Sequence, residues 1–247
     1  MIRNLILAIG FFTRIPVPDH PHFNDRIMHN TIYYFPLVGL LVGVLNLFIF
    51  WLSIQLFSVP IAVILSLGFS LLVTGGFHED GWADTFDGLG GAFDRNKKLV
   101  IMSDSRLGSY GSLALFFILS IKVFTLIELL SINTLWIFLF AHGLSRWITV
   151  LTMVFCHYVR TEPNKIKSVA QEISIPKWLL SGLVLIPTWL FIPIPMLIIV
   201  LLSSLSICFI WIFILKKQLG GYTGDTLGAI QQSVEVTIYL SCLAYLS

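Results

Sequence analysis

Long apolar segments separated by polar connections make up most of this chain. Seven of them are candidate membrane spans: residues 32–56, 60–77, 109–130, 134–156, 178–192, 195–215 and 229–246. A spanning helix needs about 20 mostly apolar residues, because lipid offers no partners and every backbone amide must be paired within the helix. The fifth segment is short and contains Pro187, which makes it the weakest prediction. Residues 1–13 are apolar but few, and we expect them to lie in the interface or to enter the membrane only partly.

The polar connections alternate in charge. The turns around residues 58–60, 131–133 and 193–195 contain no Lys or Arg, whereas the other connections contain several. Connections rich in Lys and Arg usually face the cytoplasm. The pattern therefore predicts an all-α, polytopic bundle with about six to eight membrane segments. We expect a single domain over residues 1–247, with its polar loops on the cytoplasmic side of the cell (inner) membrane.

Composition supports a lipid environment and excludes one class of partner. Hydrophobic residues make up 57% of the chain and charged residues 11%, and the mean hydropathy is +0.90. These values are typical of a protein embedded in the bilayer rather than of a soluble domain. The formal charge of +2 and the lack of a basic run interleaved with aromatic residues argue against nucleic acid as a partner.

The densest polar segment, residues 75–88, directly follows the second candidate span. If it is helical, Asp80, Asp84 and Asp87 lie at i, i+4 and i+7 on one face. Three like charges repel one another unless a cation lies among them. Carboxylate oxygens with no cysteine nearby favour Mg²⁺ or Mn²⁺ over zinc. We therefore predict a divalent-metal site here, with an ordinary solvated acidic turn as the alternative.

Two glycine-containing segments are candidate phosphate sites. Residues 101–111 precede a long span, where a helix N-terminus supplies backbone amides and Arg106 can bind phosphate through a fork of two nitrogens. A helix cap with an exposed arginine is the competing interpretation of this segment. Residues 219–229 open the last span, where glycines can approach phosphate closely and Asp225 is a candidate metal ligand or base.

Three ionisable residues are predicted within apolar spans. His142 and Arg146 share one helical face. An arginine at that depth should meet either a buried carboxylate or an anionic ligand, and the sequence leaves both interpretations open. Lys122 is likewise embedded, and we interpret it as structural.

These motifs together resemble the cobalamin synthase family, also called adenosylcobinamide-GDP ribazoletransferases. The matching segments occur in the family's order at residues 12–16, 35–39, 75–88, 104–108, 145–146 and 221–228. Two positions depart from the family's usual pattern. Glu79 stands where an apolar residue is usual, and Gln232 stands where an acid is frequent.

The resemblance implies a Mg²⁺-dependent transferase in the last assembly step of the cobalamin nucleotide loop. A hydroxyl of α-ribazole, or of α-ribazole 5′-phosphate, would attack the phosphorus attached to cobinamide in adenosylcobinamide-GDP and expel GMP. Asp80, Asp84 and Asp87 are predicted to hold Mg²⁺, for which Mn²⁺ is a substitute. The predicted catalytic residues are His78, Asp84 and Asp225, and the predicted phosphate-binding residues are Arg14, Asp104, Ser105, Arg106, Arg146 and Gly224. A homo-oligomer and contacts with other corrinoid-pathway enzymes are compatible with this resemblance.

Two other functions fit parts of the sequence. CDP-alcohol phosphotransferases also use membrane-embedded aspartates, but their Asp-Gly-x-x-Ala-Arg pattern is absent from residues 80–85. A cation or metabolite transporter is the second alternative. Transporters usually place acidic groups near the bilayer midplane in broken helices, whereas the aspartates here follow a complete predicted span.

Overall fold

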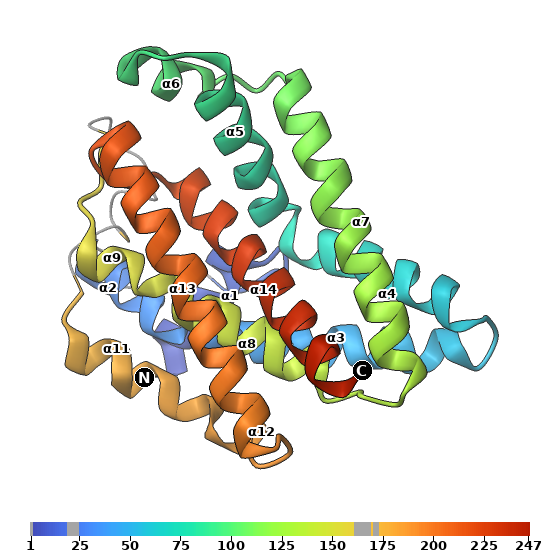
Figure 1. Cartoon of the computed structure of the whole chain (residues 1–247). Coiled ribbons are helices and arrows are strands. Elements are labelled where there is room, and N and C mark those ends of the chain that lie inside the picture. Colours follow the sequence, from blue (N-terminus) through green and yellow to red (C-terminus); the bar gives the residue numbers. More distant parts are fainter. Residues whose placement is uncertain (1, 19–24, 161–168, 170–172) are drawn as a thin grey trace.

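The computed structural model of the chain is a bundle of helices (Figure 1). It describes residues 2–18, 25–160, 169 and 173–247, and in this part of the chain the only β-type pairing is one isolated bridge between Tyr158 and Tyr222. The long helices are α3 (Phe35–Ile54), α4 (Val59–Thr74), α5 (Phe77–Gly91), α7 (Ser109–Ser131), α8 (Ile137–Val150), α13 (Ile194–Leu219) and α14 (Gly224–Leu246). The short elements are α1 (Ile2–Phe12), α2 (Asp25–Asn30), η1 (Thr31–Tyr34), α6 (Arg95–Ile101), α9 (Thr152–Phe155), α11 (Ile175–Gly182), η2 (Leu183–Leu185) and α12 (Ile186–Trp189).

Within the described residues, four helical stretches are long and apolar enough to cross a membrane. They are Ile27–Ile54, Ser109–Ser131, Ile137–Phe155 and Ile194–Leu219, and the bent pair α4–α5 would make a fifth. The helical membrane bundle is thus confirmed, with fewer clear spans than the six to eight predicted. Residues 178–192 are divided among α11, η2 and α12, because Pro187 cannot continue a regular helix. Helix α14 is not among the four, since it carries the polar residues Gln231, Gln232 and Glu235.

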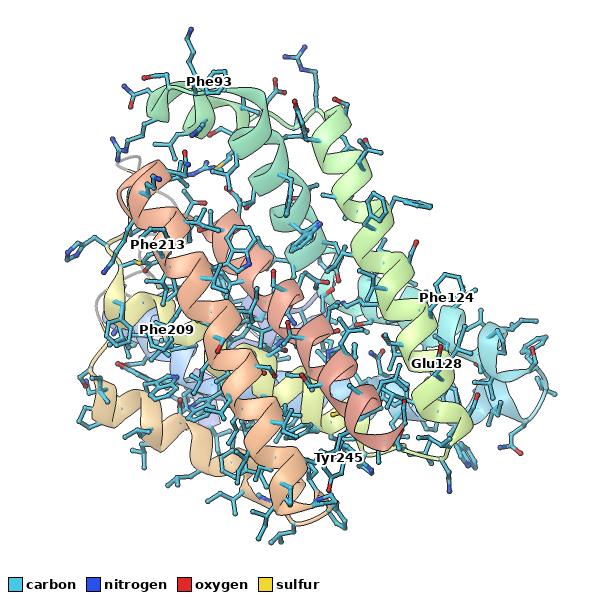
Figure 2. All side chains as sticks on the ribbon, in the orientation of Figure 1. Phe93, Phe124, Glu128, Phe209, Phe213 and Tyr245 are labelled. Atoms are coloured by element: carbon cyan, nitrogen blue, oxygen red, sulfur yellow. The ribbon has the colours of Figure 1, made fainter. Side chains whose placement is uncertain are left out.

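Helices α8 and α14 form the centre of the bundle. Every residue of α8 except the half-buried Leu139 is buried, and α14 contacts α5, α7, α8 and α13. Helix α3 packs along α8 and α4. The outer helices carry exposed aromatic side chains such as Phe124 on α7 and Phe213 on α13, each 67% exposed (Figure 2). Such side chains are costly in water and suited to lipid, so the bundle buries polar residues inside and presents apolar residues outside.

The charged connections and the uncharged turns lie at opposite ends of the bundle. In Figure 1, α6 and the α13–α14 turn are at the upper end, whereas the α7–α8 and α12–α13 turns are at the lower end. The upper end carries the basic residues Arg95, Lys97, Lys98, Lys216 and Lys217. The predicted separation of basic and uncharged connections is therefore present in these four connections.

Two consecutive glycines produce a sharp bend between α4 and α5. Gly75 and Gly76 have φ of 69° and 66°, a left-handed backbone conformation that residues other than glycine rarely adopt. The two helices consequently meet at 86°. The backbone N–H of Arg14 donates to the carbonyl of Val73, 2.7 Å away, and fixes the N-terminal segment at this corner. The bend directs the acidic helix α5 away from α4.

A pair of tryptophans fastens α11 to α8. The rings of Trp147 and Trp178 stack with centroids 4.4 Å apart and planes 4° from parallel. Each indole N–H donates to the other residue's backbone carbonyl, at 2.9 and 2.8 Å. Buried indole nitrogens need such partners, so this reciprocal arrangement holds the short helix α11 in a defined position.

Candidate functional site

The acidic segment continues as helix α5, and its three aspartates share one face as predicted. Asp80 is exposed, Asp84 is half-buried and Asp87 is buried. Glu79 and Asp80 lie in the first turn, where negative charge interacts favourably with the helix dipole. The exposure of the aspartate side chains thus decreases along this face from Asp80 to Asp87.

Asp87 has a specific structural partner in helix α7. Its two carboxylate oxygens accept hydrogen bonds from the backbone N–H groups of Gly108 and Gly111, each at 2.8 Å. These two N–H groups at the start of α7 are therefore occupied by Asp87 and are not available to a phosphate. Glycine is needed at both positions because a Cβ on either residue would collide with the Asp87 carboxylate.

Helix α14 brings Asp225 to the same region as Asp84. Two glycines permit the close approach, since Gly81 packs on the Asp225 backbone and Gly228 packs on the His78 backbone. The first turn of α14 is fixed by a capping box, in which Thr223 and Thr226 each accept a hydrogen bond from the other's backbone N–H. The half-buried carboxylate of Asp84 interacts electrostatically with Asp80, Asp225 and Asp87. The anion of Asp84 is consequently disfavoured unless a cation is nearby.

Gly81 provides a test of this helix contact. In Gly81→Ala the new Cβ would lie 2.6 Å from the carbonyl oxygen of Asp225, so the two helices must separate. We expect the free energy of unfolding to fall by about 1–3 kcal/mol, measured as an earlier transition in a denaturant titration of the detergent-solubilised protein. Gly68→Ala in α4 is the matched control, because its Cβ meets no atom within 4 Å. Equal stability of the two variants would contradict the close contact.

Arg160 is a site residue that sequence reasoning missed. Its guanidinium donates to Asp225 Oδ2 at 2.6 Å, to the carbonyl of Met102 at 3.2 Å and to Ser103 Oγ at 3.0 Å. Segment 157–160 is held against the α13–α14 turn, where Val159 donates to the Tyr222 carbonyl and Tyr222 donates to the His157 carbonyl. Arg160 therefore joins three segments that are distant in the sequence.

The predicted phosphate loop lies at the surface. Arg106 pairs with Asp104 at 2.6 Å, and its side chain is 87% exposed. The Arg106 hydrogen bonds hold the pKa of the Asp104 carboxyl below its usual value. Ser105 is also exposed. The segment that carries these three residues is joined to the aspartates at both ends, by Gly108, which bonds Asp87, and by Ser103, which bonds Arg160.

His78 lies on the side of α5 away from Asp80. His78 is 2% exposed and stacks on Phe35, with ring centroids 5.8 Å apart. His78 and Gly224 line a small apolar cavity of about 40 Å³. On a helix, His78 is rotated by roughly 160° from Asp80. The structure therefore does not bring His78 together with Asp84. Arg14 is exposed and packs over Gly75 at the α4–α5 corner.

Arg146 belongs to a polar network inside the bundle rather than to the aspartate face. Its Nη1 donates to the His142 carbonyl at 2.9 Å, and its guanidinium lies 5.6 Å from the centroid of the Phe35 ring. His142 Nδ1 is 3.4 Å from Glu235, which also pairs with Lys122 at 2.9 Å. Arg146 is therefore linked to Glu235 through His142 and makes no direct ion pair with a carboxylate of the described residues, and its buried Nε has no hydrogen-bond partner there. Both interpretations of Arg146 stay open.

The aspartates fit Mg²⁺ best as a pair of ligands. Among the described residues, no group of three or more His, Cys, Asp or Glu side chains is placed to hold a metal on its own. Asp87 already uses both oxygens, and Asp225 is paired with Arg160. Mg²⁺ often binds through one or two carboxylates and completes its shell with water and substrate phosphates. Asp80 and Asp84 are the two aspartates of this face that could provide such carboxylates.

Comparison with known proteins identifies the family. The protein-family model described as cobalamin-5-phosphate synthase matches residues 4–243 of this chain. A Vibrio cholerae protein named adenosylcobinamide-GDP ribazoletransferase is 40% identical over 243 residues, which cover 98% of this chain and 93% of the relative. A Shewanella baltica protein of the same name is 40% identical over 245 residues, covering 96% and 92%. No solved structure matches the chain. The resemblance seen in the motifs is confirmed, and the chain belongs to the cobalamin-5-phosphate synthase family.

Proposed function

We propose that this protein is an adenosylcobinamide-GDP ribazoletransferase. A ribose hydroxyl of α-ribazole, or of α-ribazole 5′-phosphate, attacks the phosphorus attached to cobinamide. The new P–O bond forms as the bond to the bridging oxygen breaks, GMP leaves, and the hydroxyl proton is released. The relatives' shared name supports this reaction. The observation that carries it in this chain is the meeting of Asp80, Asp84 and Asp225 with Arg160 at one end of the bundle.

The proposed metal is Mg²⁺, held by Asp80 and Asp84, with Mn²⁺ as a substitute. When bound, the ion would neutralise charge on the diphosphate and on departing GMP. The half-buried position of Asp84 among like charges supports a cation at this face. Asp87 would act by fixing the start of α7 beside the site, since its oxygens are used by Gly108 and Gly111.

The remaining residues have separate proposed roles. Asp225 would accept the hydroxyl proton, and its bond to Arg160 orients the carboxylate. Arg160 and the exposed Arg106 would hold phosphate oxygens, since catalysis of phosphoryl transfer is mostly positioning and charge neutralisation. The basic residues of α6 and of the α13 C-terminus share this end of the bundle and support a cytoplasmic orientation in the inner membrane.

A direct assay tests the proposed reaction. Purified protein in detergent or liposomes is incubated with adenosylcobinamide-GDP, α-ribazole and Mg²⁺, and GMP and cobalamin are quantified by chromatography. We expect both products in equal amounts, no product with excess chelator, and recovery on adding Mg²⁺ or Mn²⁺. Failure to form GMP by folded protein with either form of α-ribazole would reject the reaction. Full activity in the presence of chelator would reject the proposed metal dependence but not the proposed reaction.

Arg160→Lys tests whether the guanidinium fork is needed. Lysine keeps the charge but cannot reach Asp225, Met102 and Ser103 together. We expect kcat to fall at least about tenfold, equivalent to losing about 1.4 kcal/mol of transition-state stabilisation. Arg3→Lys, at an exposed position of α1, is the matched control. If both variants retain the wild-type rate, Arg160 has no role in positioning Asp225.

A further inference from the structure

A second cavity of about 580 Å³ lies between the N-terminal elements and α11. Its walls come from α1, α2, η1, the start of α3, α11 and η2, and its polar side chains include Asn4, Asn30, Tyr33 and Lys177. The volume falls within the range of pockets that bind small molecules. None of the residues considered for the transfer reaction is among the described residues that line it.

The polar part of this cavity suits an anion. Lys177 Nζ lies 5.7 Å from the centroid of the Tyr33 ring, and none of the described lining residues is acidic. The Tyr33 hydroxyl is 3.4 Å from His29 Nε2, which holds the ring in place. An ammonium group beside amide and hydroxyl groups can bind a phosphate and its neighbouring polar atoms.

The apolar part of the cavity continues onto the outer surface of α11. Leu180 lines the cavity and is 66% exposed, and its neighbours Leu179 and Leu183 are 51% and 54% exposed. Because Leu180 both lines the cavity and is exposed, an apolar tail bound there can continue along the outer apolar surface of the bundle. A ligand with a charged head and a long apolar tail would cover both parts.

The helices around the cavity also suit the membrane interface. Helix α1 has 11 residues and α11 has eight, so neither can cross a bilayer alone. Short amphipathic helices of this kind lie along the interface, where lysine and tyrosine side chains meet lipid headgroups. The reciprocal Trp147–Trp178 bonds fix α11, and with it Lys177, relative to the bundle.

We propose that this cavity binds the headgroup of an anionic phospholipid. Lys177 contacts the lipid phosphate, Asn4, Asn30 and Ser181 offer hydrogen bonds to the glycerol or headgroup, and the acyl chain lies on Leu180 and Val184. The bound lipid would fasten α1 and α11 to η1. An anionic lipid is preferred because Lys177 has no acidic neighbour among the described lining residues.

Native mass spectrometry of the full chain, released from nanodiscs containing equal parts phosphatidylglycerol and phosphatidylcholine, tests this site. We expect wild-type protein to retain phosphatidylglycerol preferentially and Lys177→Gln to retain about fivefold less, since one lysine near a membrane surface contributes about 1 kcal/mol to anionic lipid binding. Lys217→Gln, an exposed lysine of α13 that does not line the cavity, should retain the wild-type amount. Leu180→Gln should also reduce retention, and it provides a second variant should Lys177→Gln fail to fold.

The same variants separate a lipid from a soluble phosphate ester. Loss of lipid retention with an unchanged KM for α-ribazole 5′-phosphate supports the proposal. Unchanged retention in both Lys177→Gln and Leu180→Gln overturns it. A raised KM for α-ribazole 5′-phosphate with normal lipid retention also overturns it, and would assign the cavity to the substrate instead. Lipid retention is measured without turnover, so failure of the lipid proposal can be distinguished from failure of the transfer reaction.

Discussion

Asp84→Asn is expected to lower the rate of GMP release at least about 100-fold while the protein remains folded. The substitution keeps the size of the side chain but removes the charge at the centre of the aspartate face, where Asp80, Asp87 and Asp225 surround it. If Asp84 is one of two protein ligands of Mg²⁺, loss of its charge removes several kcal/mol of charge stabilisation in the transition state. The rate is measured with saturating adenosylcobinamide-GDP and α-ribazole over a range of Mg²⁺ concentrations.

Asp94→Asn is the matched control for this prediction. Asp94 is an exposed aspartate at the same end of the molecule, where it caps α6 by accepting from the backbone N–H of Lys97, and asparagine is an equally good cap. We expect this variant to lose much less activity than Asp84→Asn. Binding of Mn²⁺ followed by electron paramagnetic resonance should be weakened only by changes at Asp80 or Asp84. Normal turnover by a folded Asp84→Asn protein would remove this residue from the metal site.

The sequence predicts that Asp80, Asp84 and Asp87 share one face on the condition that their segment is helical, and α5 meets that condition. The role of Asp87 could not be predicted, because its partners Gly108 and Gly111 are more than 20 residues away. Arg160 was missed for a similar reason. Its bond to Asp225 depends on how segment 157–160 packs against the α13–α14 turn, and no local pattern encodes that contact.

The two departures from the family pattern have a common structural explanation. Gln232 Nε2 donates to Glu79 Oε1 at 2.9 Å, so the unusual acid on α5 faces the position on α14 where an acid is frequent. Lys122 Nζ is 3.8 Å from the same Glu79 oxygen. A carboxylate on either helix can therefore lie close to Lys122. Lys122 and Gln232 fall in predicted spans and Glu79 in the polar segment, and only the packing of α5, α7 and α14 reveals that the three are neighbours.

Glu235→Gln is expected to destabilise the bundle by about 3–5 kcal/mol, because it leaves Lys122 with a single, more distant carboxylate. Glu235 is 1% exposed and joins four partners: Lys122 at 2.9 Å, His142 at 3.4 Å, Gln231 at 2.6 Å and Tyr239 at 3.1 Å. A buried ammonium without full compensation is costly in lipid. The free energy of unfolding is measured by titrating detergent-solubilised protein with a denaturing detergent and following tryptophan fluorescence.

The control is Glu128→Gln, which removes an exposed acid on α7 (Figure 2) and should change stability by less than about 0.5 kcal/mol. The double variant Lys122→Met with Glu235→Gln distinguishes loss of an ion pair from loss of packing. Because it removes both charges, it should be more stable than Glu235→Gln alone, and the two changes should not be additive. If Glu235→Gln is as stable as Glu128→Gln, the buried pair does not hold α7 against α14. If the double variant is instead less stable than Glu235→Gln, the loss comes from the shape and hydrogen bonds of the two side chains, and the charge of Lys122 is compensated elsewhere.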